Sequence, residues 1–344
     1  MSKKNSSVIL REGFKDQEEL FKIYSTFKKN LKSFSKKNFL VAVSGGPDSL
    51  ALTALSKAIS YEVKCKIYYV LIDHNLRKNS SKEAKSVKKL LKKYNINLFI
   101  LKNKKVINKN IQSQARKIRY DLLIAFCKKK NVRTILTAHN LEDQVETFFI
   151  RLSRGSGLQG LSSIKEISKL NKNITLVRPL LDFKKNQLIK ISKLIFGKFY
   201  KDPTNNDNKY LRTRIRRLKT SLEKSGVNYN QIIKSIKNLA SSRDTLDLYF
   251  NKIYKDLLIS KKKRISLNLE KFNNLNQEMR MRVLSRSIKE ITKSYYSLRS
   301  KKIINVDNQL KMKNNLKLPL AGCLIFKDKK HIIIEKVKKN RISQ

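Results

Sequence analysis

Residues 44–49 read Ser-Gly-Gly-Pro-Asp-Ser and combine the residue types that bind phosphate groups. The run Phe-Leu-Val-Ala-Val precedes them and an Ala- and Leu-rich stretch follows, which predicts a strand that turns through two glycines into a helix. Glycine tolerates positive φ and lets a ligand approach the backbone. The first N–H groups of a helix lack partners within it and therefore bind anions. The predicted nucleotide contacts in this loop are Ser44, Gly45, Gly46, Pro47, Asp48 and Ser49.

Two members of this loop have more specific predicted roles. Pro47 suits the first position of a helix, where no N–H donor is needed. Asp48 would repel a phosphate unless a cation lay between them, so we predict that Asp48 binds Mg²⁺. The loop is not of the Walker type, because no lysine follows the glycines. It resembles the PP-loop of enzymes that cleave ATP between its α and β phosphates, adenylate a substrate and release pyrophosphate.

The elements that must position this loop alternate along the chain. We expect strands at 38–43, 67–72, 97–101, 134–138 and 174–178. We expect helices near 48–59, 80–94, 112–130 and 140–152. Strands that alternate with helices indicate an α/β fold with a parallel sheet covered on both faces. Ligands of such sheets bind beyond the carboxyl ends of the strands, near the point at which the strand order reverses.

Polar side chains follow two of these strands. Asp73 and His74 end the second, where they can contact a ribose, a base or a metal-bound water, or form a turn that caps a helix. His139, Asp143 and Glu146 follow the fourth with i, i+4, i+7 spacing, which places them on one stripe of a helix. The two carboxylates can hold Mg²⁺ or bind a cationic amine. His139 can act as a general base or a phosphate contact. The opposite stripe, expected to be buried, contains Leu141, Val145, Phe148 and Leu152.

Arginines near the expected helices can serve the same phosphate chemistry or bind RNA. Arg116 and Arg119 share a helix face and can neutralise charge as ATP is cleaved, or can be ordinary surface residues. Residues 154–161 form a basic, glycine-rich loop that can close over a substrate or RNA. The predicted RNA contacts are Arg154, Arg212, Arg214, Arg216 and Arg217.

The last four of these arginines lie on one expected helix. A tight polar turn at 202–207 leads into that helix. Arg212 and Arg216 share a stripe with Lys219, which suits the RNA backbone. Arg214 points elsewhere, toward the site or a hinge between domains. A solvated basic helix face is the alternative interpretation.

The composition constrains the class of partner. The chain has 344 residues with 79 Lys+Arg against 26 Asp+Glu, so its net charge is +53 and nucleic acid is the leading candidate partner. A bias toward Lys, Asn and Ile explains lysine in place of arginine, but not the scarcity of acids. The three cysteines lie far apart without a C-x-x-C pair, which argues against a structural zinc site or a disulfide scaffold. No long apolar run or signal core is present, so we expect a cytoplasmic protein without a membrane partner.

The pattern of elements changes along the chain and indicates several domains. We expect a basic lead-in over 1–37, an ATP-binding catalytic domain over 38–222, a helical domain over 223–298 and a short β appendage over 299–344. The helical domain is expected because 209–224, 228–256 and 270–295 lack strand signals. Nothing in the sequence fixes the oligomeric state, which leaves a homodimer open.

The motifs taken in order are more specific than any one of them. The set comprises residues 44–49, 73–77, 115–120, 137–147, 154–161, 178–181 and 202–216. Together they resemble the tRNA(Ile)-lysidine synthases, strongly over 35–220 and weakly beyond. One departure is Thr213, because the family tends toward Arg-Asn-x-Ile-Arg where residues 212–216 here read Arg-Thr-Arg-Ile-Arg.

The resemblance implies a PP-loop domain of the adenine nucleotide alpha hydrolase type and a helical tRNA-binding domain. It implies that ATP and Mg²⁺ are used to attach free L-lysine to C2 of cytidine 34 in tRNA(Ile) with a CAU anticodon, so that the anticodon reads AUA in place of AUG. In the mechanism that the resemblance implies, the cytidine carbonyl oxygen attacks the α-phosphate, Mg²⁺ held by Asp48 stabilises the departing pyrophosphate, and Arg116 balances charge near the α-phosphate. The lysine ε-amine, held by Asp143 and Glu146, then expels AMP, and Asp143 or His139 accepts its proton.

Two alternatives belong to other classes of protein. Another PP-loop tRNA-modifying enzyme, such as a thiolase, would need paired or suitably placed catalytic cysteines, whereas Cys65 and Cys127 are poorly placed. A non-enzymatic RNA-binding protein would fit the charge. It would need neither the phosphate loop nor the stripe of His139, Asp143 and Glu146.

Overall fold

The computed structural model divides the chain into two compact units, Met1–Ala240 and Ser241–Gln344, which we call unit 1 and unit 2. Each has a hydrophobic core of its own. The residues described are 14, 18–32, 38–63, 65–76, 79–105, 107, 111–200, 209, 211–261, 264–293, 298, 300–312 and 315–337.

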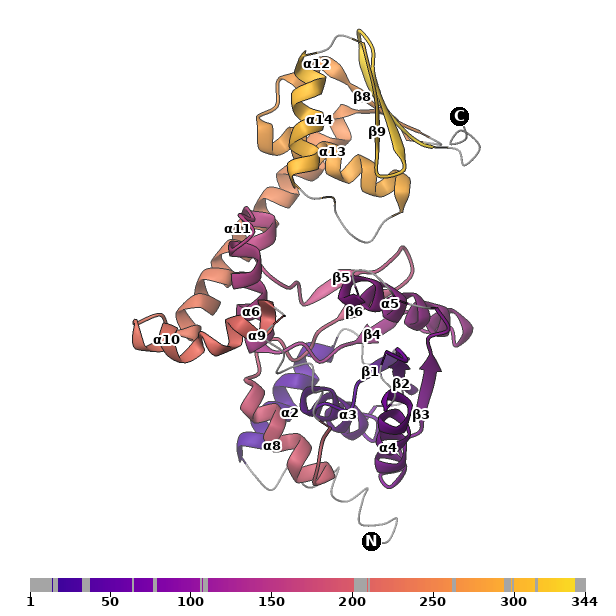
Figure 1. The fold of residues 1–344 in the computed structure, drawn as a ribbon, viewed down its shortest axis with the longest axis vertical. Coiled ribbons are helices and arrows are strands. Elements are labelled where there is room, and N and C mark those ends of the chain that lie inside the picture. The colour runs from indigo at the N-terminus through magenta and orange to yellow at the C-terminus, as the bar shows by residue number, and fades with distance from the viewer. Residues whose placement is uncertain are drawn as a thin grey trace. The chain divides into compact units, whose positions relative to one another are not determined.

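The described strands of unit 1 form one sheet in the order β3-β2-β1-β4-β6-β5 (Figure 1). They are β1 (Phe39–Val43), β2 (Ile67–Asp73), β3 (Leu98–Lys102), β4 (Thr134–Leu136), β5 (Ile167–Lys169) and β6 (Thr175–Val177). Every pair is parallel except β5 with β6. Because β1 pairs with β2 on one side and β4 on the other, the strand order reverses between β1 and β4. A ligand is therefore expected at the carboxyl ends of these two strands.

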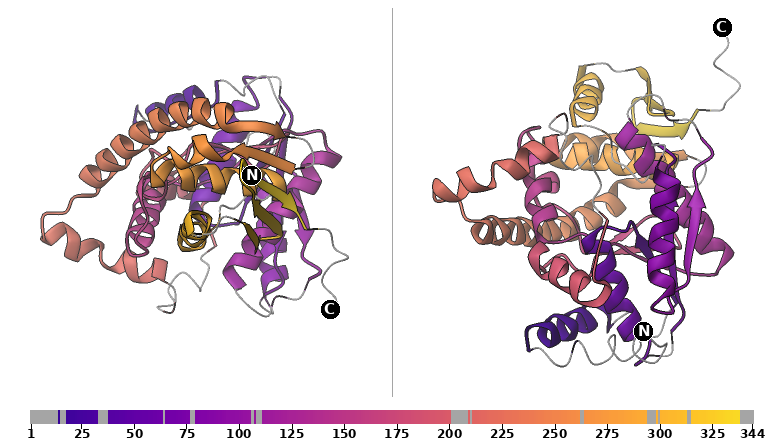
Figure 2. Two further views of the ribbon diagram at one scale, coloured as in Figure 1. Left: turned by 90° about the horizontal axis from the view of Figure 1, so that it is seen from above. Right: turned by 60° about the horizontal axis from the view of Figure 1, so that its bottom comes forward.

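Helices cover both faces of this sheet, as Figures 1 and 2 show. Alternation along β2 explains the two layers, because successive side chains of a strand point to opposite faces. Tyr69 and Leu71 pack in the core that includes helices α3 and α8, whereas the Tyr68 ring lies 5.8 Å from that of Phe126 on α5. The helices of this part of the chain are α2 (Glu18–Leu31), α3 (Pro47–Ile59), α4 (Ser80–Lys92), α5 (Ile111–Lys129), α6 (Leu141–Leu152), α7 (Leu158–Leu161), α8 (Lys185–Phe196), α9 (Leu211–Arg217), α10 (Lys219–Lys224) and α11 (Tyr229–Leu257).

Unit 2 packs helices on one face of an antiparallel sheet. Its strand order is β7-β8-β11-β10-β9. The strands are β7 (Leu258–Lys261), β8 (Arg264–Asn268), β9 (Leu316–Leu320), β10 (Cys323–Lys327) and β11 (His331–Lys336). The helices are α12 (Leu269–Asn273), α13 (Gln277–Thr292) and α14 (Ser300–Met312). Ile325 and Ile334 face the helices and are fully buried, as is the ion pair in which Arg280 Nε lies 2.8 Å from Asp307 Oδ1.

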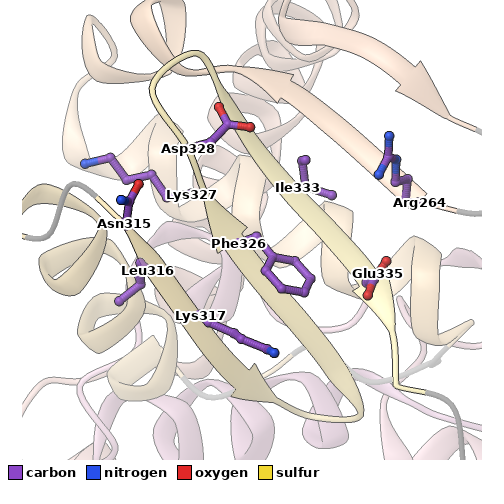
Figure 3. Close-up of a pocket in the computed structure, with 9 residues that line it drawn as sticks. All are labelled: Arg264, Asn315, Leu316, Lys317, Phe326, Lys327, Asp328, Ile333 and Glu335. Atoms are coloured by element: carbon purple, nitrogen blue, oxygen red, sulfur yellow. The ribbon is translucent and has the colours of Figure 1, made fainter.

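The outer face of the unit 2 sheet carries a shallow pocket. Figure 3 shows Phe326 on β10 beside Ile333 and Lys317 of the two adjacent strands. The pocket is lined by charges of both signs: Arg264 pairs in register with Glu335, and Asp328 follows Lys327 in sequence. None of the side chains predicted to perform chemistry lines this pocket.

The α/β class and the parallel sheet are confirmed, and each predicted strand and helix of 38–152 is present within a few residues. The domain boundaries differ from those expected. Helix α2, part of the expected lead-in, buries Leu20 and Phe27 in the core of unit 1. The helical region and the β appendage share one core, because β7 and β8 join the C-terminal strands.

Candidate active site

The loop after β1 has the conformation that a phosphate site requires. Gly45 has φ of +85°, and a Cβ atom there would lie 2.6 Å from Val87 Cγ2, so both the backbone angle and the close packing require glycine. Helix α3 begins at Pro47 with Gly46 as its N-cap, and no side chain caps it. The N–H groups of its first turn therefore remain available to an anion.

Hydrogen bonds within the loop fix its shape. The Ser49 hydroxyl accepts from the Ser44 N–H at 3.1 Å and donates to the Gly46 carbonyl at 2.9 Å. The Tyr200 N–H donates to the Gly45 carbonyl at 2.9 Å. Ser44 is exposed and Ser49 is buried. The Ser44 hydroxyl also donates to the Ser49 hydroxyl at 3.1 Å, so Ser49 organises the loop.

Asp48 lies in the first turn of α3, where the Asn140 side chain hydrogen-bonds its carboxylate. Its Oδ1 atom is buried and has no hydrogen-bond partner. Burial raises the pKa of Asp48 to about 6, and the charge of Lys185 opposes that rise while Asp143 adds to it. A buried oxygen without a partner fits a cation. Since no group of three His, Cys, Asp or Glu side chains gathers as a metal site in the described residues, Asp48 would supply one ligand and phosphate oxygens and waters the rest.

Lys185 and Glu142 complete the surroundings of Asp48, and neither was predicted as a site residue. The Lys185 N–H, at the first residue of α8, donates to Glu142 Oε2 at 2.9 Å. The Leu141 N–H donates to the Phe183 carbonyl at 3.0 Å. These contacts hold the start of α8 against the start of α6.

Asp73 and His74 lie at the carboxyl end of β2, as predicted. Asp73 is buried and accepts from the Ser81 hydroxyl at 2.5 Å and the Asn75 N–H at 3.0 Å. Burial opposes its ionisation, but these hydrogen bonds prevail and lower the pKa of Asp73. The His74 ring faces Arg119, and burial together with that charge lowers the pKa of His74 to about 4. His74 is therefore neutral at physiological pH, and its buried Nδ1 has no partner.

His139 lies before the helix rather than on it, which corrects the predicted stripe. Helix α6 begins at Leu141, and Asn140 is its N-cap in a capping box with Asp143: the Asp143 N–H donates to Asn140 Oδ1 at 2.9 Å, and the Asn140 N–H to Asp143 Oδ2 at 3.2 Å. His139 Nδ1 lies 3.0 Å from the Thr137 hydroxyl. Burial lowers the pKa of His139, so the ring is neutral. Val145 is buried as predicted, but Leu152 is 49% exposed.

Glu146 is buried and binds two arginines of α9. Arg216 donates to both its carboxylate oxygens, from Nη2 at 3.1 Å and from Nε. Arg212 Nε lies 2.9 Å from Glu146 Oε2, and Arg212 Nη2 lies 3.9 Å from Asp143 Oδ1. Burial raises the pKa of Glu146 against the effect of Arg216. Arg212 and Arg216 thus face the site, whereas Arg214, expected to point toward the site or a hinge, is exposed.

The other predicted RNA contacts lie outside this cluster. Arg217 is exposed on α9 and Arg154 is exposed in the turn after α6. The glycine-rich loop is held against the end of α6, because Arg151 Nη1 donates to the Gly160 carbonyl at 2.7 Å. The turn predicted at 202–207 lies outside the described residues.

Arg116 and Arg178 add positive charge near His139. Arg116 lies on α5 with its guanidinium 5.2 Å from the Tyr120 ring centre. Arg178 follows β6, is buried, and donates from Nη1 to the Lys165 carbonyl at 2.6 Å, while its Nε has no partner. Both charges disfavour protonation of His139 and so contribute to its lowered pKa, after burial.

The predicted chemical groups therefore meet at one edge of the sheet. The phosphate loop follows β1, Asp73 ends β2 and His139 follows β4. Helix α6, which comes next in the chain, contains Asp143 and Glu146. This arrangement can hold a nucleotide at α3 and place a cationic group beside Asp143.

Comparison with known proteins agrees with this geometry. Residues 20–221 match the model of the PP-loop domain family. The tRNA(Ile)-lysidine synthase of Wolbachia pipientis wMel is 35% identical over 310 residues, which cover 89% of this chain and 72% of that protein. The chain belongs to the tRNA(Ile)-lysidine synthase family.

Other members of the family are more distant. The tRNA(Ile)-lysidine synthase of Rickettsia bellii (strain OSU 85-389) is 29% identical over 327 residues, 91% of this chain and 73% of that protein. Among solved structures, the U34-tRNA thiolase NcsA from Methanococcus maripaludis with its [4Fe-4S] cluster is 18% identical, with a TM-score of 0.55 over 64% of this chain and 78% of that chain. This second likeness shows the fold alone. Within the described residues no helix is both long and apolar enough to cross a membrane.

Proposed function

We propose that this chain ligates L-lysine to C2 of cytidine 34 in tRNA(Ile), at the cost of ATP, with AMP and pyrophosphate as products. The observation that carries the proposal is the placement of the phosphate loop and the His139–Asp143 pair at adjacent carboxyl ends of β1 and β4, in a chain of this family. An adenylated base formed at the loop would then lie next to groups that bind and deprotonate an amine.

In the first step the cytidine O2 atom attacks the α-phosphate, and the bond between that phosphate and pyrophosphate breaks. The N–H groups at the start of α3 bind the departing oxygens. Asp48 would hold Mg²⁺, which neutralises phosphate charge when it is bound. We assign Arg116 to the charge at the α-phosphate.

In the second step the lysine ε-amine attacks C2 and AMP leaves. Free lysine is cationic in water, with a pKa of about 10.4, so the amine must lose a proton first. Asp143 is better placed than Glu146 to accept that proton. One Asp143 oxygen accepts from the Asn140 N–H, and the other has only Arg212 nearby, at 3.9 Å. Neutral His139 is the alternative acceptor. Glu146, held by Arg212 and Arg216, shapes the amine site from behind.

We assign the basic surface to tRNA binding. We also place the protein in the cytoplasm. Arg154, Arg214 and Arg217 are exposed and suit phosphate contacts. Arg212 and Arg216 would reach tRNA only by leaving Glu146. We assign unit 2 to tRNA binding, in place of the separate helical domain and appendage expected from sequence.

The test is incorporation of labelled L-lysine into a tRNA(Ile) transcript with a CAU anticodon. The purified chain should transfer label only when ATP and Mg²⁺ are both present, and pyrophosphate release should require tRNA. The matched control is the same transcript with cytidine 34 changed to uridine. Label in that control, or none in the first, would contradict the proposal. Size-exclusion chromatography of the same sample tests whether the enzyme is a homodimer.

A further inference from the structure

The phosphate loop brings no cation of its own. Residues 44–49 contain neither lysine nor arginine, and α3 continues through Leu50 and Ala51. Loops of the Walker type place a lysine on the β and γ phosphates. If this site binds ATP as proposed, the terminal phosphates need a protein cation in addition to a metal ion, and that cation must come from another element.

Lys185 lies where such a cation is needed. Its backbone N–H is fixed to Glu142 at 2.9 Å, and the preceding Phe183 carbonyl is fixed to Leu141 at 3.0 Å, so the start of α8 is anchored beside the start of α6. Along its length α8 packs against α3, the helix whose first turn carries Asp48. The backbone position of Lys185 is therefore set by contacts in which its own side chain takes no part.

The side chain is free to bind a ligand. Lys185 is half-buried, and in the described part of the chain its ammonium group has no hydrogen bond or ion pair. Its charge nevertheless acts on Asp48 across the site and lowers the pKa of that carboxyl against the effect of burial. Two arginines of the site are engaged elsewhere, Arg178 with the Lys165 carbonyl and Arg216 with Glu146, and Arg116 is assigned to the α-phosphate.

We propose that Lys185 is the protein cation of the phosphate site and binds non-bridging oxygens of the pyrophosphate half of ATP. The inference rests on the proposed function. When the cytidine O2–phosphorus bond forms and the bond to the β-phosphate oxygen breaks, negative charge develops on the departing pyrophosphate. The ammonium group neutralises that charge and transfers no proton. Lys185 thus does from α8 what the Walker lysine does from its own loop.

The test measures binding of α,β-methylene-ATP with Mg²⁺ to the full chain by calorimetry. Lys185→Met should weaken binding about 10- to 100-fold, the range for loss of a hydrogen bond to a charged group. Lys185→Arg should recover most of that loss because it keeps the charge. AMP, which lacks the pyrophosphate half, should bind both variants as it binds the wild type. Lys193→Met, at an exposed lysine of the same helix, is the matched control and should change nothing.

Each outcome decides between the two proposals. Normal binding of the analogue by Lys185→Met, or an Arg variant no better than the Met variant, overturns the role of Lys185. Loss of AMP binding in the Met variant also overturns it, because that loss would indicate a structural role. A wild-type chain that binds the analogue but makes no lysidine would refute the proposed function and leave the Lys185 result intact.

Discussion

Replacing Asp48 with asparagine should stabilise the ligand-free protein while it abolishes nucleotide binding. Burial raises the pKa of Asp48 from 3.8 to about 6, so at neutral pH folding forces a charge into a site that disfavours it. At 1.36 kcal/mol per pH unit this costs at most about 3 kcal/mol, and less to the extent that solvent screens the carboxylate. Asparagine has the shape of the protonated acid without its titration.

The sign of the pH dependence follows from the direction of this shift. A raised pKa in the folded state means that stability from this group is fully present below its unfolded pKa, near 3.8, and is lost as pH rises through about 6. The advantage of Asp48→Asn should therefore be largest above pH 6 and vanish near pH 4. Comparison of variant with wild type at each pH removes the contributions of other carboxylates.

The measurement is thermal unfolding of both proteins across this pH range, with and without Mg²⁺ and ATP. Without ligand, the variant should unfold up to roughly 6–12 °C higher at neutral pH, since 1 kcal/mol shifts Tm by about 2–4 °C in a unit of this size. With ligand, only the wild type should gain stability. A variant that is less stable at neutral pH, or a difference that ignores pH, would refute the argument that Asp48 is held for a cation.

Three further predictions concern the same site. Asp143→Asn should abolish transfer of labelled lysine yet bind tRNA and unfold normally, because the amide oxygen can still accept from the Asn140 N–H in the capping box. Unchanged transfer would exclude the assigned role. Glu146→Ala should lower the free energy of unfolding by about 1–3 kcal/mol in denaturant titrations, since Arg212 and Arg216 lose the carboxylate that accepts their hydrogen bonds but stay partly solvated. Gly45→Ala should eliminate ATP binding in a filter assay, because the new methyl group would lie 2.6 Å from Val87 Cγ2 and alanine would have to adopt a positive φ. Normal affinity would show that the loop adapts.

Local sequence patterns predicted most of unit 1 because they express short-range physics. The spacing of apolar residues indicates whether a segment is a strand or a helix, and glycines at a strand end indicate where that strand stops. Neither signal depends on the rest of the fold. That is why the loop at 44–49 and Asp73 lie where expected. His139 was wrongly placed on the stripe of α6 although a signal against that was present. Asn140, followed three residues later by Asp143, has the spacing of a capping box, which excludes His139 from the helix.

Contacts between distant residues were not predictable in this way. Arg216 and Glu146 are 70 residues apart, and nothing in helical periodicity indicates which face of α9 meets α6. Lys185 and Glu142 are 43 residues apart, and a lysine in a chain of this composition carries no signal of its own. Strands β7 and β8 were not predicted for a related reason, because no glycine or proline lies between them in the sequence.

The placement of the few acidic residues resolves a conflict in the proposed reaction. A net charge of +53 attracts tRNA over long distances but repels the cationic amino acid that must also bind. Salt screens such fields within about 8 Å at physiological ionic strength, so the long-range repulsion affects encounter more than binding. Close to the site, Asp48, Glu142, Asp143 and Glu146 stand together, three of them on α6. Arg212 and Arg216 neutralise Glu146 but leave Asp143 with one oxygen only loosely paired, so an approaching ammonium group meets an available carboxylate even though the surrounding protein is positive.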